Sequence, residues 1–452
     1  MGSDSNDGSI DTPWRTLQHA FDTGSAVPGD AVCVRAGIYA GGIVRQDGTA
    51  ESPITLRPYN GEDVIVDGNL NVPQYKANTI YFYDASCDRY DPSYVVPCKA
   101  SHWVIDGLEI LGSDDEAGGA YYAVKIDQPN VTLRNNNIHR SIYDLVKAVK
   151  TADNLVIENN EIHDSGITGQ ANCQGIDMVG GDHLLVTRNH IYSINSIGAY
   201  AKGNARGAIF EQNLIENVYE RGIMLGQSTD STSLIDGDYE CYDCIARNNI
   251  IVSTQGSCIG ISSSKNSKVF NNTCFMTASR SQAAIYLSRE SEIQTRNCGV
   301  DIRNNIIHQA ARAAGVTSTL YMVKVGSYGL HNGSVVGADD NSCSSGFSGL
   351  TMNNNIYVAE DGSSLSVKFQ WADIGLYQAA GYSFDVWKST TGLDANSSII
   401  DPLFTAPTTG DFRLRLGSPA IDAGAILPDV ASDYLSHARP AGNSTDIGAL
   451  EF

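Results

Sequence analysis

The stretch GAYAKGNARGAIFEQNLIENVYERGIMLG, residues 198–226, places two cations, Lys202 and Arg221, among short apolar segments. Strand interiors favour β-branched and aromatic residues, so charges at such positions suggest a task beyond folding. Arginine and lysine bind carboxylate and sulfate groups, and a lysine that has lost its proton can act as a general base. The pair therefore suits removal of a proton next to a carboxylate. The alternative is that both are solvated surface charges.

Short segments of the same kind recur along the chain. They are AVKID (123–127), VKAVK (146–150), GIDMV (175–179), GAYAK (198–202) and GIMLG (222–226). Because side chains alternate across a strand, we expect the apolar residues to point inward and those between them outward. The first outward row would hold Lys125, Lys147, Asp177, Tyr200 and Met224, and the second Asp127, Val149, Val179, Lys202 and Gly226.

Two histidines extend this face. His139 and His163 occupy matching positions in NIHRS and EIHDS, and we expect them on the approach to the outward rows. With Lys125, Lys147 and Tyr200 they form a predicted substrate-binding patch that is basic and aromatic on an otherwise acidic chain. A groove for an acidic sugar chain needs this composition, because cations bind the acidic groups while tyrosine stacks on sugar faces or moves protons.

Carboxylates near the same face allow a different reaction. Asp177 lies in the first outward row, and Asp164 and Glu220 could lie close to it. Two carboxyl groups about 5–10 Å apart would make a glycoside hydrolase. The alternatives are structural, because Asp177 could form a salt bridge with a lysine of the rows and Glu220 could pair with Arg221.

A repeat must position these segments. An Asn shortly before an apolar residue recurs along the chain. Several of these asparagines are 24 residues apart, and the other spacings are longer. The asparagines are Asn136, Asn160, Asn189, Asn213, Asn248, Asn272, Asn304 and Asn354. Each unit contains short strands and no amphipathic helix. A unit of about 24 residues is too short for a propeller blade, but it fits one coil of a parallel β-helix. Asn tolerates the left-handed conformation at a turn, and stacked coils would join these side chains in a ladder.

The two ends of the chain break the repeat and are expected to cap it. TPWRTLQHAFDTGSAVPGD predicts an amphipathic helix that begins at Pro13, ends at Gly24 and covers the first coil. The Pro- and Gly-punctuated tail should pack over the last coil as an irregular cap. We therefore predict one all-β domain over 1–452, composed of the cap and first coils at 1–70, central coils at 71–354 with insertions at 226–244 and 310–350, and the C-terminal cap at 355–452.

Composition narrows the function classes. A net charge of −21 and a pI near 4.7 argue against nucleic acid as a partner, because its binding needs basic surfaces. No apolar run is long enough to span a membrane, and Met1-Gly2-Ser3 is typical of an expression start after removal of a signal peptide. We expect a secreted or periplasmic monomer whose partner is a polysaccharide.

The ten cysteines are spread over the chain, and we expect them to be mostly buried, with a few loop disulfides. Cys87 and Cys98 flank a loop that they could close. Cys241 and Cys244 form a C-x-x-C, but no second pair at zinc-ribbon spacing accompanies them, and no helix suggests a redox motif.

The chain ends resemble those of a known superfamily. GSDSNDGSIDTPWRTLQHAFD…GDAVCVRAGIY resembles the N-terminal cap of secreted right-handed parallel β-helix proteins, and DPLF…GDFRL…GSPAIDAG…DIGALEF resembles their C-terminal segment. The resemblance covers nearly the whole chain and implies a right-handed parallel β-helix. That superfamily contains polysaccharide lyases, glycoside hydrolases, epimerases, phage tailspikes and adhesins, so the fold alone leaves the reaction open.

Lys202 and Arg221 are similar to the Lys…Arg arrangement of the chondroitin and alginate lyases of this fold. In that family the lysine takes the C5 proton of a uronate, and the arginine assists. The resemblance implies β-elimination of an acidic polysaccharide, with Lys202 as base and Arg221 as carboxylate neutraliser. Calcium ligands precede the lysine there, whereas INSIGAY (194–200) has no carboxylate. The sequence thus assigns no metal ligand and requires no cofactor, although DGDYE (236–240) offers oxygens for Ca²⁺.

Two other functions stay open. Asp177 with a second carboxylate would give a glycoside hydrolase, for instance on a sulfated glycan that the same cations would bind. A non-catalytic glycan-binding adhesin or tailspike-like protein would present stacked aromatic residues, and the outward rows show no repeated aromatics.

Overall fold

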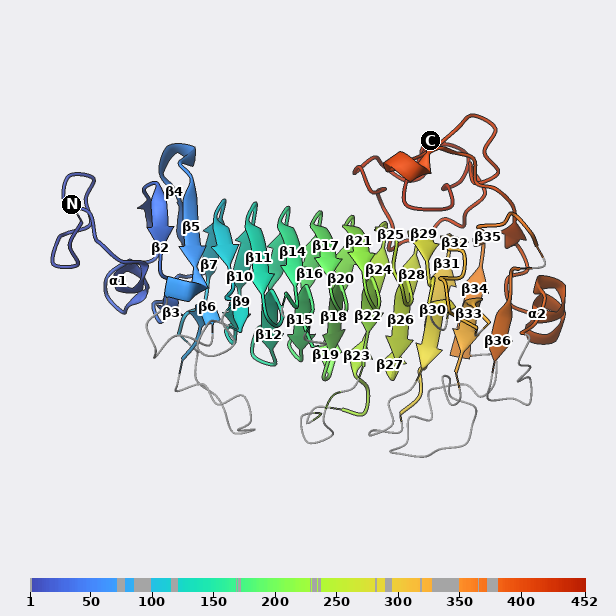
Figure 1. Cartoon of the computed structure of the whole chain (residues 1–452), viewed down its shortest axis with the longest axis horizontal. Helices are drawn as coiled ribbons and strands as arrows, with labels where there is room; N and C mark the ends of the chain where they lie inside the picture. Colours follow the sequence, from blue (N-terminus) through green and yellow to red (C-terminus); the bar gives the residue numbers. More distant parts are fainter. Residues whose placement is uncertain are drawn as a thin grey trace. The chain divides into compact units, whose positions relative to one another are not determined.

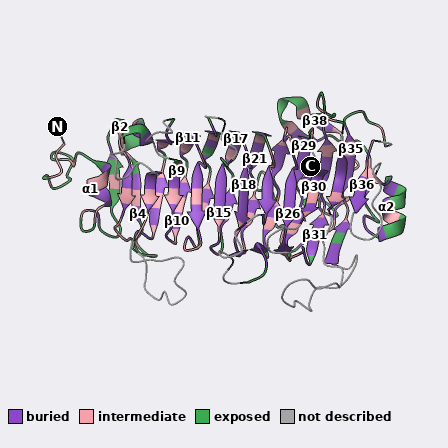
Figure 2. Ribbon diagram, turned by 60° about the horizontal axis from the view of Figure 1, so that its bottom comes forward, coloured by how far each residue is buried: buried purple, intermediate pink, exposed green. Residues whose placement is uncertain are grey.

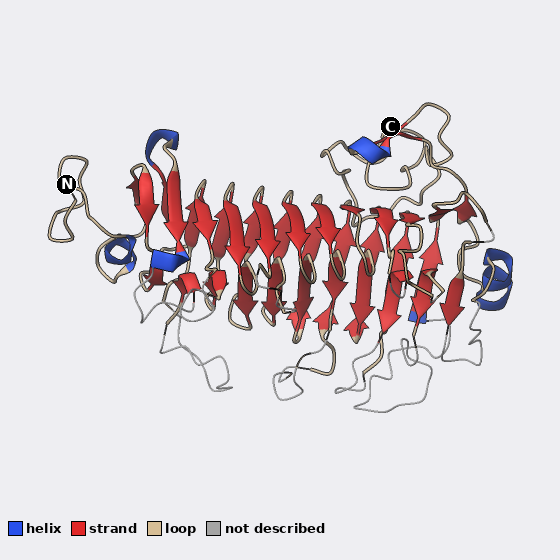
Figure 3. Ribbon diagram, in the orientation of Figure 1, coloured by secondary structure: helices blue, strands red, loops and turns tan. Residues whose placement is uncertain are grey.

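The computed structural model describes residues 2–70, 78–84, 99–114, 121–167, 169, 172–227, 229, 234, 237–280, 283–288, 295–317, 319–326, 349–364, 366–371 and 381–452. The chain divides into two compact units, Met1–Ala199 and Tyr200–Phe452, which are described separately. Strands make up nearly all of the regular structure, and the helices are short (Figure 3). The single domain over 1–452 stays a prediction.

In the first unit the strands form three parallel sheets, and successive coils add one strand to each. The first sheet contains β1 (Ala31–Val34), β4 (Ile54–Pro58), β7 (Trp103–Asp106), β10 (Val131–Arg134), β13 (Val156–Glu158) and β16 (Leu185–Thr187). The second contains β2 (Gly37–Tyr39), β5 (Val64–Asp67), β8 (Glu109–Leu111), β11 (Asn137–Ser141), β14 (Glu161–Ser165) and β17 (His190–Ile194). The third contains β3 (Gly42–Val44), β6 (Asn78–Phe82), β9 (Tyr122–Ile126), β12 (Val146–Val149) and β15 (Ile176–Val179).

The second unit repeats this arrangement. Its first sheet contains β20 (Ile209–Glu211), β24 (Ile245–Arg247), β28 (Lys268–Phe270), β31 (Val300–Arg303) and β34 (Leu350–Asn353). Its second contains β21 (Leu214–Val218), β25 (Ile250–Val252), β29 (Thr273–Thr277), β32 (Ile306–Gln309), β35 (Ile356–Ala359) and β37 (Ser398–Ile399). Its third contains β18 (Ala199–Lys202), β22 (Ile223–Leu225), β26 (Ile259–Ser262), β30 (Ala283–Ser288), β33 (Tyr321–Val325) and β36 (Phe369–Trp371). A short sheet joins β19 (Ala205–Arg206), β23 (Cys241–Tyr242) and β27 (Ser264–Lys265), and β38 (Phe404–Ala406) pairs with β39 (Asp411–Leu414).

Neighbouring strands within each sheet come from successive coils, so the fold is a parallel β-helix, as the repeat predicts. Ile138 of β11 lies opposite Ile162 of β14, one 24-residue step later. Val124, Val146 and Ile176 stack in the same way, and each is fully buried. The strands are mostly coloured as buried in Figure 2. Burial of such a side chain contributes about 1.5–3 kcal/mol, so the inward columns form the core.

The N-terminal helix exists but is shorter than predicted. α1 spans Leu17–Phe21 rather than Pro13 to Gly24. The Thr16 hydroxyl accepts the N–H of His19 and caps the helix, while the Asp4 carboxylate accepts the N–H groups of residues 15 and 16 and holds them outside it. The chain is extended again at Asp22. Leu17, Ala20 and Phe21 are buried, so the short helix still supplies the predicted apolar face.

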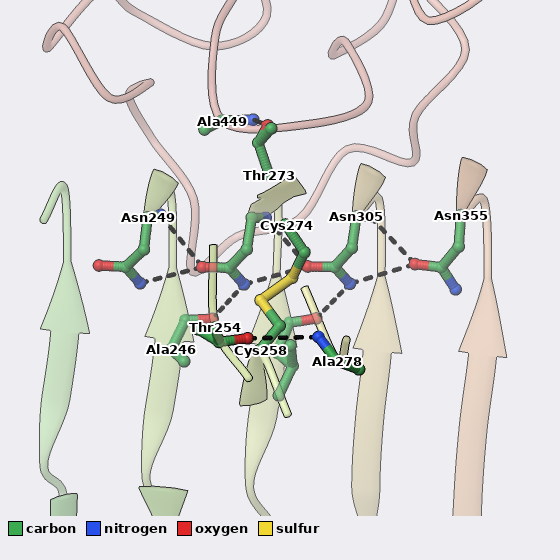
Figure 4. Close-up of a disulfide and its surroundings, with 12 residues drawn as sticks. Ala246, Asn249, Thr254, Cys258, Thr273, Cys274, Ala278, Asn305, Asn355 and Ala449 are labelled. Carbon is green, nitrogen blue, oxygen red and sulfur yellow. Dashed lines mark hydrogen bonds between the residues drawn. A yellow bond between two sulfur atoms is a disulfide. The ribbon is translucent and has the colours of Figure 1, made fainter. Parts of the chain in front are cut away.

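The predicted asparagine ladder is present inside the turns. Its side chains donate from Nδ2 to the Oδ1 of the asparagine one coil later, at 2.9–3.1 Å. Its members are Asn136, Asn160 and Asn189 in the first unit and Asn213, Asn249, Asn272, Asn305 and Asn355 in the second. Part of the ladder is visible in Figure 4. Three predicted members, Asn248, Asn304 and Asn354, are therefore each wrong by one residue.

The error has a physical cause, because the turn and the ladder use neighbouring residues. The residue before each ladder member takes the left-handed conformation, as Asn159 does with a φ of 53° and Asn248 with a φ of 54°. The following asparagine points inward and bonds to the next coil. The sequence analysis gave both tasks to a single residue.

The C-terminal tail, predicted to pack over the last coil, lies along the turns of several coils, and the last coil is one of them (Figure 1). In the second unit, left-handed turn residues donate their side-chain amides to tail carbonyl groups at 2.6–3.0 Å. The pairs are Gln212–Asp433, Asn248–Ser432, Asn271–Asp446, Asn304–Ala425 and Asn354–Ala423. The outward side of each turn is thus a binding site for the tail.

A second helix packs on the last strands. α2 spans Phe384–Thr391, and its Trp387 ring stacks on Phe369 of β36 at 5.2 Å. Three 3₁₀ turns, Tyr59–Gly61, Gly68–Leu70 and Pro407–Thr409, complete the described helical structure. No helix among the described residues is long and apolar enough to cross a membrane.

Cysteines form two disulfides within the described part of the second unit. Cys241 and Cys244 are bonded to each other, so the C-x-x-C is a disulfide. The predicted Cys87–Cys98 closure lies outside the described residues.

Cys258, just before β26, is bonded to Cys274 of β29, and both are fully buried (Figure 4). A cross-link over a sequence separation of 16 residues restricts the unfolded chain and contributes about 3 kcal/mol. We expect Cys258→Ala/Cys274→Ala to lose about 2–4 kcal/mol of unfolding free energy in chemical denaturation. Reduction of the wild-type protein, which also breaks Cys241–Cys244, should cause at least the same loss. If the reduced protein keeps its stability, the variant acts through packing instead.

Candidate functional site

Three residues of the first predicted row lie side by side in the first unit. Lys125 of β9, Lys147 of β12 and Asp177 of β15 are register partners, and Tyr81 of β6 continues the row. We call these four residues the lysine row. The row is mostly covered, since Asp177 is 1% exposed and the Lys147 side chain is 17% exposed.

Asp144 joins the lysine row from the turn before β12, and the sequence analysis missed it. Its Oδ1 accepts the backbone N–H of Gln174 at 2.8 Å, and its Oδ2 lies 3.5 Å from Lys147 Nζ. The same Nζ contacts Asp177 Oδ2. One ammonium group thus holds two carboxyl groups, which is the salt bridge that had been the structural alternative for Asp177. Asp144 precedes Lys147 by three residues, which was the available sequence signal for this contact, but Asp144 lies in a turn and the predicted rows contain strand residues alone.

The cluster has unusual protonation. Burial raises the pKa of Asp144 well above its usual value, and the charge of Asp177 raises it further while Lys147 opposes this. Burial acts to lower the pKa of Lys147, but the Asp177 and Asp144 carboxylates outweigh it and raise that pKa. Burial also raises the pKa of the adjacent Tyr122. Asp144 therefore holds its proton more tightly than an ordinary aspartate, while the raised pKa of Lys147 keeps that side chain charged, so Lys147 cannot serve as a base.

Lys125 is held within the lysine row by a ring and a carboxylate. Its Nζ lies 4.7 Å from the centre of the Tyr81 ring and 3.7 Å from Asp127 Oδ2. The Tyr81 hydroxyl donates to the same Asp127 oxygen at 2.6 Å. Substrate binding by Lys125 stays a prediction, and it would compete with this ion pair.

The predicted histidines lie on a different sheet from the lysine row. His139 of β11 and His163 of β14 are register partners in the second sheet, and Tyr192 of β17 continues them. The rings are stacked, with centroids 4.8 Å apart for the histidines and 4.6 Å apart for His163 and Tyr192. His139 Nε2 also lies 3.0 Å from Glu109 Oε1. The histidines therefore form a separate ring stack, which is a repeated aromatic row that the sequence analysis did not find.

Burial lowers the pKa of His139, with the Glu109 contact opposing this and His163 adding to it. A histidine whose folded pKa lies below its unfolded value of about 6.5 costs no stability above that pH, and stability falls as the pH drops through the folded pKa. We expect the unfolding free energy to fall between pH 7 and pH 5, and to fall less in His139→Tyr, which keeps a stacked ring. Urea unfolding at several pH values measures this. Equal pH dependence in both proteins would exclude His139 as the cause.

Lys202 ends β18 in the second unit. Its Nζ lies 4.9 Å from the centre of the Tyr200 ring, and Tyr200 is 2% exposed. The positive charge of Lys202 also acts on Glu240, which belongs to the predicted insertion at 226–244. Glu240 is fully buried, and it accepts the N–H groups of Gly203 and Thr229 at 2.7 and 2.8 Å. Burial raises the pKa of Glu240, although these hydrogen bonds oppose the rise.

Arg221 precedes β22, and its side chain crosses the next coil over a bare backbone. A Cβ placed at Gly260 would lie 2.3 Å from Met224 Sδ and 3.0 Å from Arg221 Cδ. Arg221 Nη1 lies 3.6 Å from Glu220 Oε2, so the ion pair that had been the structural alternative is present. The whole side chain of Arg221 is 18% exposed, so only a small part of it faces solvent.

Lys202 and Arg221 lie at opposite ends of two neighbouring strands, Lys202 at the end of β18 and Arg221 before the start of β22. The N–H of Gly226, just after β22, donates to the carbonyl of Ala201 at 2.8 Å, which sets Lys202 beside Gly226. Arg221 comes five residues earlier, about 16 Å along an extended chain. A single sugar can touch both cations only if the two long side chains lean toward each other. Asp177 belongs to the first unit, so its place relative to this pair is not described.

The described residues contain no group of three or more His, Cys, Asp or Glu side chains that could hold a metal ion. Both Glu240 oxygens are already engaged by Gly203 and Thr229. Two other acidic residues of the insertion, Asp230 and Asp236, lie outside the described residues. The described residues therefore do not fit the calcium site that the resemblance implies, and calcium dependence stays a prediction.

Comparison with known proteins supports the interpretation of the central strands as coils of a β-helix. Residues 122–307 match the family described as the right handed beta helix region. The sequence is 33% identical over 143 residues to pectate lyase PEL9 of Emericella nidulans. That match takes in 30% of this chain and 32% of the relative, so the chain spans about a third of the length of the curated protein that it matches.

Solved structures agree on the fold. Pectate lyase Pel9A has a TM-score of 0.51 at 15% identity, covering 100% of this chain and 94% of its own. The complex of XylC with xylose has a TM-score of 0.51 at 12% identity, covering 99% and 97%. At these identities the likeness shows the fold alone, and the predicted right-handed parallel β-helix is confirmed.

Proposed function

Because the chain is a right-handed parallel β-helix like pectate lyase Pel9A, we propose that it is a secreted enzyme that depolymerises an acidic polysaccharide by β-elimination. The observation that supports this most is Lys202 at the end of β18, with its amine over the Tyr200 ring and a fixed buried carboxyl beside it. The similarity to pectate lyase PEL9 makes pectate the first substrate to test.

In the proposed reaction Lys202, as a neutral amine, removes the proton on C5 of a uronate, next to the carboxylate. The electrons of the C5–H bond form a C4=C5 double bond, the C4–O glycosidic bond breaks, and the leaving oxygen takes up a proton. Arg221 binds a substrate carboxylate and stabilises the charge that develops there.

A polysaccharide panel tests the proposal, with alginate, pectate, chondroitin and dermatan sulfates, hyaluronan, fucoidan and neutral glucans, each with and without calcium. The readouts are ultraviolet absorbance of the unsaturated uronate and new reducing ends. Both signals should rise together on at least one acidic polymer. Neither signal, with retained binding, would point to a non-catalytic glycan-binding protein and would remove the proposal.

One observation favours a hydrolase as the second candidate. Burial and the charge of Asp177 raise the pKa of Asp144, which lies next to Asp177 at Lys147, so the pair would provide an acid and a carboxylate. Both are engaged by Lys147, however, and Asp144 is fully buried. New reducing ends without absorbance, abolished in both Asp144→Asn and Asp177→Asn, would establish this candidate over elimination.

A further inference from the structure

A cleft of about 720 Å³ lies in the second unit, between the outer face of the second sheet and the C-terminal segment around β37 and β38. Its lining includes Phe275, His308, Glu360, Ile400, Asp401 and Arg415. Lys202 and Arg221 are not part of this lining. The volume falls in the range of about 300–1,000 Å³ that is typical of small-molecule sites, so this is a second site distinct from the proposed catalytic one.

Packed rings fix one wall of the cleft. The ring of His308 on β32 stacks on Phe275 of β29, with centroids 4.6 Å apart. Phe275 also meets Phe404 and Phe412 edge-on, at 6.5 and 5.3 Å. These last two rings belong to the β38–β39 pair, so the tail is anchored on the coil where the cleft begins. A wall held by four rings is preorganised and needs little ordering when a ligand binds.

Polar groups converge beside this wall. His308 Nε2 lies 3.4 Å from Glu360 Oε2, while its Nδ1 is buried and has no hydrogen-bond partner among the described residues. Burial lowers the pKa of His308, with Glu360 and Asp401 opposing this, so the ring is neutral at pH 7 and keeps both donor and acceptor capacity. Because Nδ1 has no surface open to the cleft, a ligand hydroxyl would meet His308 at the edge that carries Nε2 and the Glu360 carboxylate.

We propose that this cleft binds an uncharged saccharide. Hydroxyl groups of the sugar donate to the Glu360 and Asp401 carboxylates and bond to His308, while its C–H face contacts exposed Ile400. The carboxylates of Glu360 and Asp401 outnumber the one arginine of the lining, Arg415, and so disfavour uronates and sulfated sugars, which separates this site from one that handles an acidic polymer. The inference goes beyond the proposed function, because the cleft can hold neutral sugar whether or not the protein is a lyase.

Calorimetric titration of the full chain with xylotetraose, cellotetraose and mannotetraose, and with trigalacturonate as the acidic probe, tests this site. We expect at least one neutral tetrasaccharide to bind. His308→Phe keeps the ring packing against Phe275 but loses both nitrogens, and Glu360→Gln keeps shape but loses charge. Each should weaken binding about 10-fold or more, since a hydrogen bond to a charged group contributes about 1.5–3 kcal/mol.

The control variant Asp385→Asn makes the same change of charge on the exposed side of α2 and should bind as the wild type does. Thermal melting establishes that each variant is folded, and Asp401→Asn replaces either one that is not. Absence of binding by all three neutral probes, or binding that survives His308→Phe and Glu360→Gln, would overturn the proposal. Preferential binding of trigalacturonate at this cleft would overturn it as well. Elimination activity should be unchanged in these variants, so the two proposals fail independently.

Discussion

Lys202→Ala is expected to lower kcat/KM for elimination by about 10²–10⁴-fold, which is the usual contribution of a positioned general base. The reason is that the C5 proton then has only water to accept it, while Arg221 still binds the polymer. KM should therefore change less than kcat. Initial rates of absorbance increase on the polymer identified by the panel measure the effect, and a small exogenous amine should restore part of the lost rate.

Two further variants make this result specific. Lys388→Ala removes another lysine that lies over an aromatic ring, 4.4 Å from the centre of Phe384, and should leave the rate unchanged. Asp177→Ala should retain turnover if the reaction is elimination, provided that the variant folds. Full activity in Lys202→Ala would show that the base lies elsewhere, and loss in Asp177→Asn with Lys202→Ala unaffected would favour hydrolysis.

Asn160→Ala is expected to cost about 3 kcal/mol or more of unfolding free energy. Asn160 Oδ1 accepts the backbone N–H of Asn136 at 2.9 Å, and its Nδ2 donates to the carbonyl of Leu133 at 2.9 Å and to Asn189 Oδ1 at 3.0 Å. Alanine leaves these groups buried without partners, at about 1–3 kcal/mol for each. Hydrogen exchange gives a local readout, because the N–H of Asn136 should lose its protection first.

Asn159→Gly is the matched control for the ladder variant. Asn159 is the exposed neighbour in the left-handed conformation, with a φ of 53°, and glycine adopts that conformation without strain. The unfolding free energy of Asn159→Gly should differ from that of the wild type by no more than a few tenths of a kcal/mol. A loss equal to that of Asn160→Ala would mean that the turn, and not the ladder, carries the stability.

The sequence predicted what depends on local pattern. The alternation of Val124 with Lys125, and of Val146 with Lys147, fixed which side chains enter the core, and parallel pairing then aligned equal positions of successive coils. The 24-residue step between Ile138 and Ile162 follows for the same reason. Burial on one face specifies strand register strongly, because a slip by one residue would expose every core side chain.

What the sequence did not predict depends on contacts between distant segments. The approach of Asp144 to Lys147 and Asp177 arises where a turn folds back over the sheet, and the burial of Glu240 arises from a loop that closes on Gly203. The His308 cleft needs a tail that is about 100 residues away in sequence. Each of these contacts occurs once along the chain, so no repeating sequence pattern predicts it.

The tail that runs along the turns has a consequence for how the second unit forms during synthesis. Stacked coils ordinarily become stable one after another as they leave the ribosome, since each contacts only its neighbours. Here Gln212 and Asn271 donate to carbonyl groups of Asp433 and Asp446, and the N–H of Ala449 donates to Thr273 Oγ1 at 3.0 Å. These coils therefore stay incomplete until residues 423–449 have been made. A nascent chain that ends before residue 423 presents a row of side-chain amides without these tail partners, so synthesis of the tail becomes a condition for a finished second unit.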